Sequence, residues 1–147
     1  MASIYPQVNL PTLVTPTPES RVQKYYPAPY FDFESGEFLF DGAGRPIIAN
    51  GKETFEQWCL KTCMTERNTR LAYSDKIGSE FERVMKETDP DAVKSSIVRT
   101  ITETIMVNPA AEWVKNFVFF VEGDSLWVTF EVKGREWDEA STITLQT

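Results

Sequence analysis

The chain has 147 residues, with 15 basic and 22 acidic side chains and a formal net charge of −7. This length suits one domain with its own core, and the acidic balance disfavours nucleic acid as a partner because phosphate backbones bind basic patches. No apolar run approaches the ~20 residues that cross a bilayer, and the first ten residues lack the features of a secretory signal, so we expect no membrane partner and assembly in a cytoplasm.

The sequence contains no histidine, which is the commonest general base at neutral pH and the commonest metal ligand. Its two cysteines, Cys59 and Cys63, are too few for the four ligands of a structural zinc site. We expect both to be small, buried core residues. The composition therefore predicts a protein without a cofactor or a metal and favours a non-enzymatic role.

Residues 1–29 contain six of the nine prolines. Proline fixes φ and lacks the backbone N–H, so this segment should form neither a regular helix nor a central strand. Its tyrosine and aliphatic content is higher than a solvated linker usually carries. We interpret it as an extended N-terminal arm laid along a neighbouring protein, with a disordered tail as the alternative.

Residues 30–138 predict an α+β domain, in which a small antiparallel or mixed sheet packs on two to three helices. Two aromatic segments, residues 30–33 and 37–40, flank a turn at residues 34–36, which is typical of a β-hairpin. Residues 46–48 are expected to add a short edge strand.

Three helices are predicted in the middle of the chain. The first runs from about Lys52 to Glu66, because apolar residues recur there at three- and four-residue steps. A short one is expected over residues 78–86. The third begins after Asp89, has proline in its first turn, and ends before the Asn108-Pro109 pair.

Two strands follow, over residues 113–121 and 126–133, and the Glu-Gly-Asp-Ser sequence between them is a hairpin signature. Residues 139–147 then predict a further strand, because polar and apolar residues alternate there with a period of two. The residues that define this alternation are Thr142, Ile143, Thr144 and Leu145. A terminal strand with open backbone groups is a template for another chain, and pairing inside its own sheet is the alternative.

The end of the first helix decides between a catalytic and a structural interpretation. If the helix persists to Glu66, this carboxylate points into the apolar stripe, where it must be hydrogen-bonded and paired. Arg67 and Arg70 are the nearest basic side chains, and an arginine fork holds a carboxylate through two hydrogen bonds. We predict a structural ion pair among these three residues and a loop hinge at Gly78, since glycine tolerates unusual backbone angles.

The order and spacing of these motifs resemble the sheath-initiator family of contractile phage tails, small baseplate wedge proteins shared with tailocins and type VI secretion baseplates. The resemblance covers roughly residues 38–132, and residues 31–46 look closest to the Gram-positive prophage branch. It rests on Thr65-Glu66-Arg67, Ile77-Gly78-Ser79-Glu80, Ile101-Thr102-Glu103-Thr104-Ile105 and Val107-Asn108-Pro109. The family signature is Glu-Pro-Arg, whereas Thr-Glu-Arg here lacks the proline, and Ile77 replaces an expected aromatic residue.

The resemblance implies a structural baseplate protein of a virion or tailocin particle, present as six copies around the tail tube. Its implied partners are the tail sheath protein, baseplate wedge proteins, and tail tube or tube-initiator proteins. It also implies that the C-terminal strand is offered to the first sheath ring. Trp137, which lies between two acidic residues, is predicted to be an exposed anchor for a partner.

Two other functions are compatible with the sequence. One is a peptidoglycan-cleaving muramidase, with Glu66 or Glu80 as the acid and Asp75 as its partner. A glycosidase acid needs a raised pKa in a cleft opposite a second carboxylate, whereas pairing with arginine lowers the pKa of a carboxyl group, so this function is disfavoured. The other is a general oligomerising adaptor outside phage tails.

Overall fold

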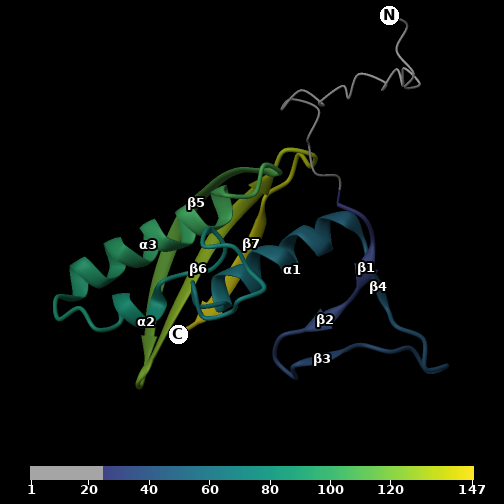
Figure 1. Ribbon diagram of the computed structural model, residues 1–147, viewed down its shortest axis with the longest axis horizontal. Helices are drawn as coiled ribbons and strands as arrows, with labels where there is room; N and C mark the ends of the chain where they lie inside the picture. Colours follow the sequence, from purple (N-terminus) through teal and green to yellow (C-terminus); the bar gives the residue numbers. More distant parts are fainter. Residues whose placement is uncertain (1–24) are drawn as a thin grey trace, which may run out of the picture.

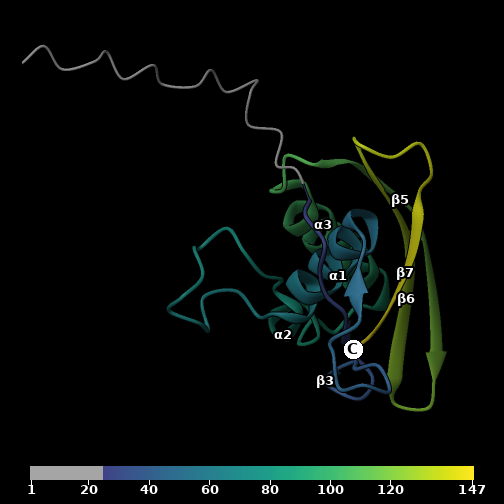
Figure 2. The same cartoon turned by 90° about the vertical axis from the view of Figure 1, so that its right-hand side faces the viewer.

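The computed structural model describes residues 25–147, so most of the predicted N-terminal arm lies outside the described residues. A three-stranded antiparallel sheet, in the order β5-β6-β7, is the main β element of the described chain. Its strands are β5 (Ala111–Glu122), β6 (Ser125–Gly134) and β7 (Ser141–Gln146). Helices cover one face of this sheet, as Figure 2 shows, and this arrangement confirms the predicted α+β class.

The helix α1 (Gly51–Met64) begins at a capping box. The Asn50 side chain accepts a hydrogen bond from the Glu53 backbone, and the Glu53 carboxylate accepts one from the Asn50 backbone. These reciprocal bonds satisfy two backbone donors that a helix start otherwise leaves open. The helix ends at Met64, two residues before the predicted end, because Thr65 adopts an extended conformation.

The helix α3 (Pro90–Met106) matches the prediction closely. Asp89 caps it, and proline occupies its first position, where the missing N–H has no helical partner to lose. Isoleucines at four-residue intervals, Ile97, Ile101 and Ile105, are fully buried. They form a continuous core with apolar residues of α1 and of the sheet, among them Phe55, Cys59, Cys63, Val128, Phe130, Val132, Ile143 and Leu145.

The strand β7 belongs to the same core. It pairs with β6 in a six-residue register that includes Phe130 with Ile143 and Val128 with Leu145. Ile143 and Leu145 face the helices and are buried, while Thr142 and Thr144 lie on the outer face. Residues 139–147 therefore complete the sheet of the domain as well as ending the chain.

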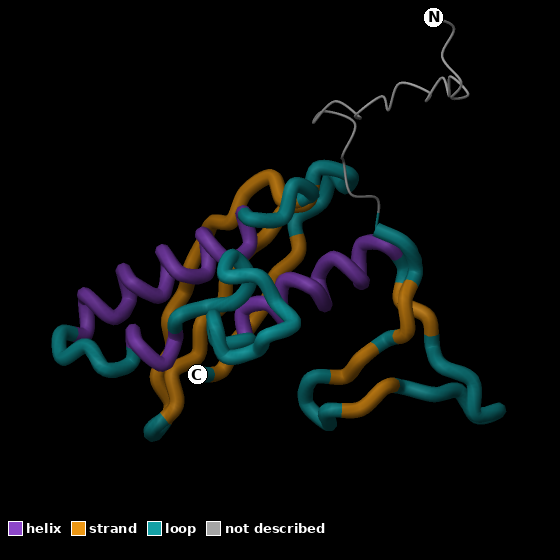
Figure 3. The backbone as a smooth tube through the Cα atoms, viewed as in Figure 1, coloured by secondary structure: helices purple, strands orange, loops and turns teal. Residues whose placement is uncertain are grey.

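Short strand pairs precede α1 and form a lobe that projects away from the sheet (Figures 1 and 3). The strand β2 (Phe31–Asp32) pairs with β3 (Glu37–Phe38), which confirms the predicted hairpin. The strand β4 (Ile48–Ala49) is close to the predicted edge strand, and it pairs with β1 (Ala28–Pro29).

The last part of the predicted arm packs on the domain. The ring of Tyr25 lies 5.4 Å from that of Phe55 and 6.3 Å from that of Trp137. Trp137 is half-buried, contacts Phe55, and covers Gly134, where a Cβ atom would lie 2.5 Å from the indole. The predicted exposure of Trp137 is therefore wrong, because the indole completes an aromatic cluster at this end of the core. Its role as a partner anchor remains a prediction.

Candidate functional site

The motif that includes Glu66 forms the base of a loop rather than the end of a helix. Residues 65–67 run parallel to residues 78–80, with a bridge between Glu66 and Ser79. The Arg67 N–H donates to the Ser79 carbonyl oxygen, and the Ser79 N–H donates to the Thr65 carbonyl oxygen, both at 2.8 Å. The loop that these bonds close extends away from the sheet, as Figure 2 shows.

Arg67 pairs with Glu80 and not with Glu66, the predicted acidic partner. The Arg67 guanidinium donates to the Glu80 carboxylate at 3.1 Å and, through Nε and Nη2, to the Gly78 carbonyl oxygen at 3.2 and 3.1 Å. Glu66 lies beyond the helix, so its side chain is not forced into the apolar stripe. Within the described residues, its carboxylate accepts only from the Glu82 N–H at 3.3 Å. Arg70 is exposed and forms no ion pair within residues 25–147.

Gly78 is required where the two segments approach each other. Its φ of +111° is disfavoured for residues with a side chain, and a Cβ atom would lie 2.8 Å from the Thr65 carbonyl oxygen. Its own carbonyl oxygen accepts from Thr104 at 2.8 Å as well as from Arg67. These contacts explain why the helix α2 (Phe81–Val84) begins later than predicted, since Gly78 and Ser79 are bonded to residues 65–67. A hinge at Gly78 remains a prediction.

The surroundings of Glu66 do not resemble a glycosidase site. The shallow pocket beside it is lined by Met64, Thr65, Glu66, Thr69, Arg70 and Tyr73. No second carboxylate from residues 25–147 lines this pocket, although both glycosidase mechanisms need a pair. Glu80 is held by Arg67 and Arg83, and Asp75 lies on the exposed loop.

One open hydrogen-bonding feature of the sheet is the outer edge of β7. Thr147 N–H donates to the Leu126 carbonyl oxygen, which places the odd-numbered residues of β7 in hydrogen-bonded pairs with β6. The backbone groups of Thr142, Thr144 and Gln146 therefore point away from β6. No backbone partner within residues 25–147 bonds them, so β7 presents an unpaired edge.

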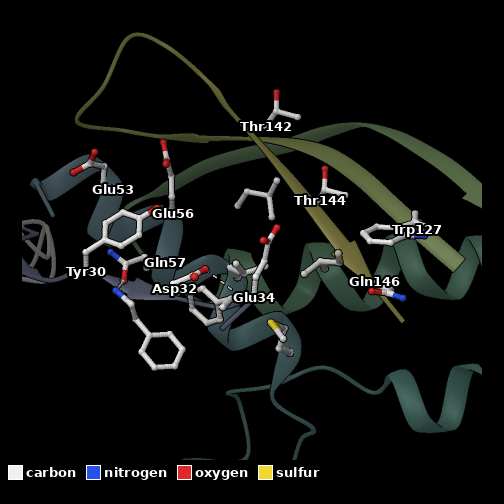
Figure 4. Close-up of a pocket in the computed structure, with 16 residues that line it drawn as sticks. Tyr30, Asp32, Glu34, Glu53, Glu56, Gln57, Trp127, Thr142, Thr144 and Gln146 are labelled. Carbon is white, nitrogen blue, oxygen red and sulfur yellow. Dashed lines mark hydrogen bonds between the residues drawn. The ribbon is translucent and has the colours of Figure 1, made fainter. Parts of the chain in front are cut away.

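A groove of about 770 Å³ runs along this edge (Figure 4). One wall is β7 with Trp127 of β6, and the other comes from α1 and the β2–β3 hairpin. Leu60 and Met64 give the α1 wall an apolar part. The Ser141 hydroxyl donates to the Glu56 carboxylate and thereby fixes the start of β7 against α1.

The groove is negatively charged. Among residues 25–147, four carboxylates line it and no lysine or arginine does. We call it the acidic groove and define it by Asp32, Glu34, Glu53 and Glu56. The Ser35 side chain and the Glu34 backbone hydrogen-bond to Asp32 and lower the pKa of that carboxyl group, so it is ionised at neutral pH. Figure 4 shows these carboxylates on the side of the groove opposite the labelled β7 residues.

A buried amide also lies at the acidic groove. The Phe31 N–H donates to Gln57 Oε1 at 2.9 Å, which ties the hairpin to α1. Gln57 Nε2 is buried and has no hydrogen-bond partner in the described part of the chain. An unsatisfied buried donor is costly, and this one belongs to the α1 wall of the groove, across from β7.

The sequence predicted the strand β7 but not the acidic groove. Its walls come from a hairpin, a helix and the last strand, which only the tertiary fold brings together. One signal was available, because Glu53, Gln57, Leu60 and Met64 recur at three- and four-residue steps and so share a helix face.

Neither a metal centre nor a reactive thiol is evident in residues 25–147. No group of three potential metal ligands occurs there, and none of the helices there is long and apolar enough to span a bilayer. Burial raises the pKa of the Cys63 thiol to about 12 and that of Cys59 well above its ordinary value. Both cysteines are core residues, as predicted.

A family model described as "Contractile injection system sheath initiator" matches residues 29–136, which is most of the chain. No curated protein matches the chain.

Proposed function

The chain belongs to the contractile injection system sheath initiators, and on this premise we propose that it begins the sheath by offering β7 to a strand of the first sheath ring. The family assignment gives it a structural role in sheath assembly and makes it a component of a contractile injection system. The partner strand and the edge that it uses are our proposal.

The observation that supports this proposal is the unpaired edge of β7. Three residues, Thr142, Thr144 and Gln146, direct their backbone donors and acceptors into a groove that is open to solvent. In β-augmentation, main-chain hydrogen bonds supply affinity, and alternate side chains set the register. The pairing of β7 with β6 fits this role, since a strand fixed in a sheet is already ordered when the partner arrives.

Several copies arranged in a ring would bind sheath subunits well even if the affinity of each β7 edge is low. We propose six copies around the tail tube, anchored to baseplate wedge and tube or tube-initiator proteins, with assembly in the host cytoplasm. Each docked sheath subunit raises the effective concentration for the next contact, so avidity exceeds the affinity of one edge. A free monomer would then bind sheath subunits too weakly to start a sheath before the baseplate forms. In this proposal the protein performs no catalysis.

The test uses a substitution on the outer edge of β7. In Thr144→Pro the outward N–H is lost, and proline is tolerated on an edge strand where no ladder bond depends on that group. Thr144→Val keeps the N–H and serves as the matched control. Deleting residues 141–147 is a poorer test, because it also removes Ile143 and Leu145 from the core.

We expect baseplates that contain Thr144→Pro to carry no sheath in negative-stain images, while Thr144→Val baseplates carry sheaths of normal length. Circular dichroism and urea unfolding of the purified variants verify that both are folded. Sheaths of normal length on folded Thr144→Pro baseplates would refute strand addition at β7.

A further inference from the structure

The acidic groove restricts which strand can add to β7. Side chains of an added strand alternate between the two faces of the sheet. Ile143 and Leu145 face the helices, so every second side chain of the added strand would also point toward α1. These side chains would enter the acidic groove, whereas the others would lie beside Thr142 and Thr144 on the outer face.

The charge of the groove favours basic side chains at the inward positions. Within the described part of the chain, four carboxylates line the groove without a lysine or arginine, and they form a region of negative potential. An acidic strand would meet like charges on both walls, which opposes binding. Lysine and arginine have apolar stems and charged ends, so they fit a wall in which Leu60 and Met64 adjoin Glu56 on α1.

The open edge of β7 supports an extended backbone as the occupant. Thr142, Thr144 and Gln146 direct main-chain donors and acceptors toward the groove, and no backbone partner within residues 25–147 bonds them. Every added strand brings the complementary main-chain groups. This edge is independent of the carboxylates, which come from the hairpin and α1.

We infer that the acidic groove selects an extended segment that carries lysine or arginine at alternate positions, with those side chains facing α1. This inference rests on the proposed pairing at β7 and adds the chemistry of the partner. It assigns selectivity to carboxylates outside the Thr-Glu-Arg motif.

The experiment compares two blocked peptides, acetyl-TKVKVKT-amide and acetyl-TEVEVET-amide, added to the full ¹⁵N-labelled chain. We expect the lysine peptide to shift the backbone amide resonances of Thr142, Thr144 and Gln146, and the glutamate peptide to leave them unchanged. Raising sodium chloride from 50 to 300 mM should weaken lysine-peptide binding, since salt screens the attraction.

Two double variants test the carboxylates. Glu34→Gln/Glu56→Gln removes two charges from the acidic groove but keeps the oxygen that Ser141 bonds, and it should weaken lysine-peptide binding about five-fold. Glu103→Gln/Glu122→Gln removes the same charge from exposed sites outside the groove and should bind like the wild type.

Three results would overturn the inference. Equal binding of both peptides at β7 would reject charge selection but leave strand addition intact. Equal weakening by both double variants would assign the effect to net charge instead of the acidic groove. If the lysine peptide does not shift the resonances of β7, the groove does not select a segment with alternate basic residues. The sheath assay on Thr144→Pro would still decide whether β7 starts the sheath.

Discussion

Replacing Arg67 with methionine tests whether this arginine, rather than Glu66, holds the loop base together. The guanidinium donates to the Gly78 carbonyl oxygen and to Glu80, and the two side chains are only 19% and 30% exposed. Hydrogen bonds from a charged donor contribute about 1.5–3 kcal/mol, and a partly exposed ion pair adds up to about 1 kcal/mol. Thr104 and Arg83 still satisfy the remaining acceptors, so the loss should be about 3 kcal/mol.

Urea unfolding measures this loss directly. A change of that size in a chain of 147 residues also lowers Tm by roughly 6–12 °C. Arg67→Lys should recover only part of the stability, because an ammonium group lacks the planar fork that bonds two acceptors.

The controls for Arg67→Met are the two other residues of the predicted ion pair. Arg70→Met should change the free energy of unfolding by less than about 0.5 kcal/mol, because Arg70 is exposed. Glu66→Gln keeps an acceptor for the Glu82 N–H and should be similarly mild. A loss of stability in Glu66→Gln as large as in Arg67→Met, or wild-type urea unfolding of Arg67→Met, would contradict a structural role for Arg67.

Three further predictions concern the core and the loop base. Gly78→Ala should cost about 3 kcal/mol or more in urea unfolding, because it combines a disfavoured φ with a 2.8 Å approach to a carbonyl oxygen; wild-type stability would contradict this. Trp137→Ala should cost about 2 kcal/mol yet leave sheath length in negative-stain images unchanged, whereas an essential partner anchor would reverse that pattern. The thiol of Cys63, with a pKa of about 12, should resist iodoacetamide at pH 8 until urea unfolds the chain, and rapid native alkylation detected by mass spectrometry would show that it is accessible.

The sequence predicted elements whose signals are local. The α3 helix has a cap, a first-turn proline and isoleucines at a helical period, and each of these acts within a few residues. The β5–β6 hairpin was equally clear, because its turn contains a glycine at positive φ between two apolar strands.

The errors arose where tertiary contacts override local pattern. The spacing of apolar residues predicted a helix through Glu66, but the hydrogen bonds that Thr65 and Arg67 make with Ser79 replace the last helical turn. Trp137 looked exposed because acidic residues flank it, although the chain turns its indole back over Gly134. The two walls of the acidic groove are far apart in the sequence, so no local pattern indicated that they meet.

A cryo-EM map of the assembled baseplate tests the central claim most directly. We expect backbone density from another chain about 4.8 Å from β7, with main-chain hydrogen bonds to Thr142, Thr144 and Gln146. A β7 edge that faces solvent, or that only side chains of a partner cover, would contradict the account.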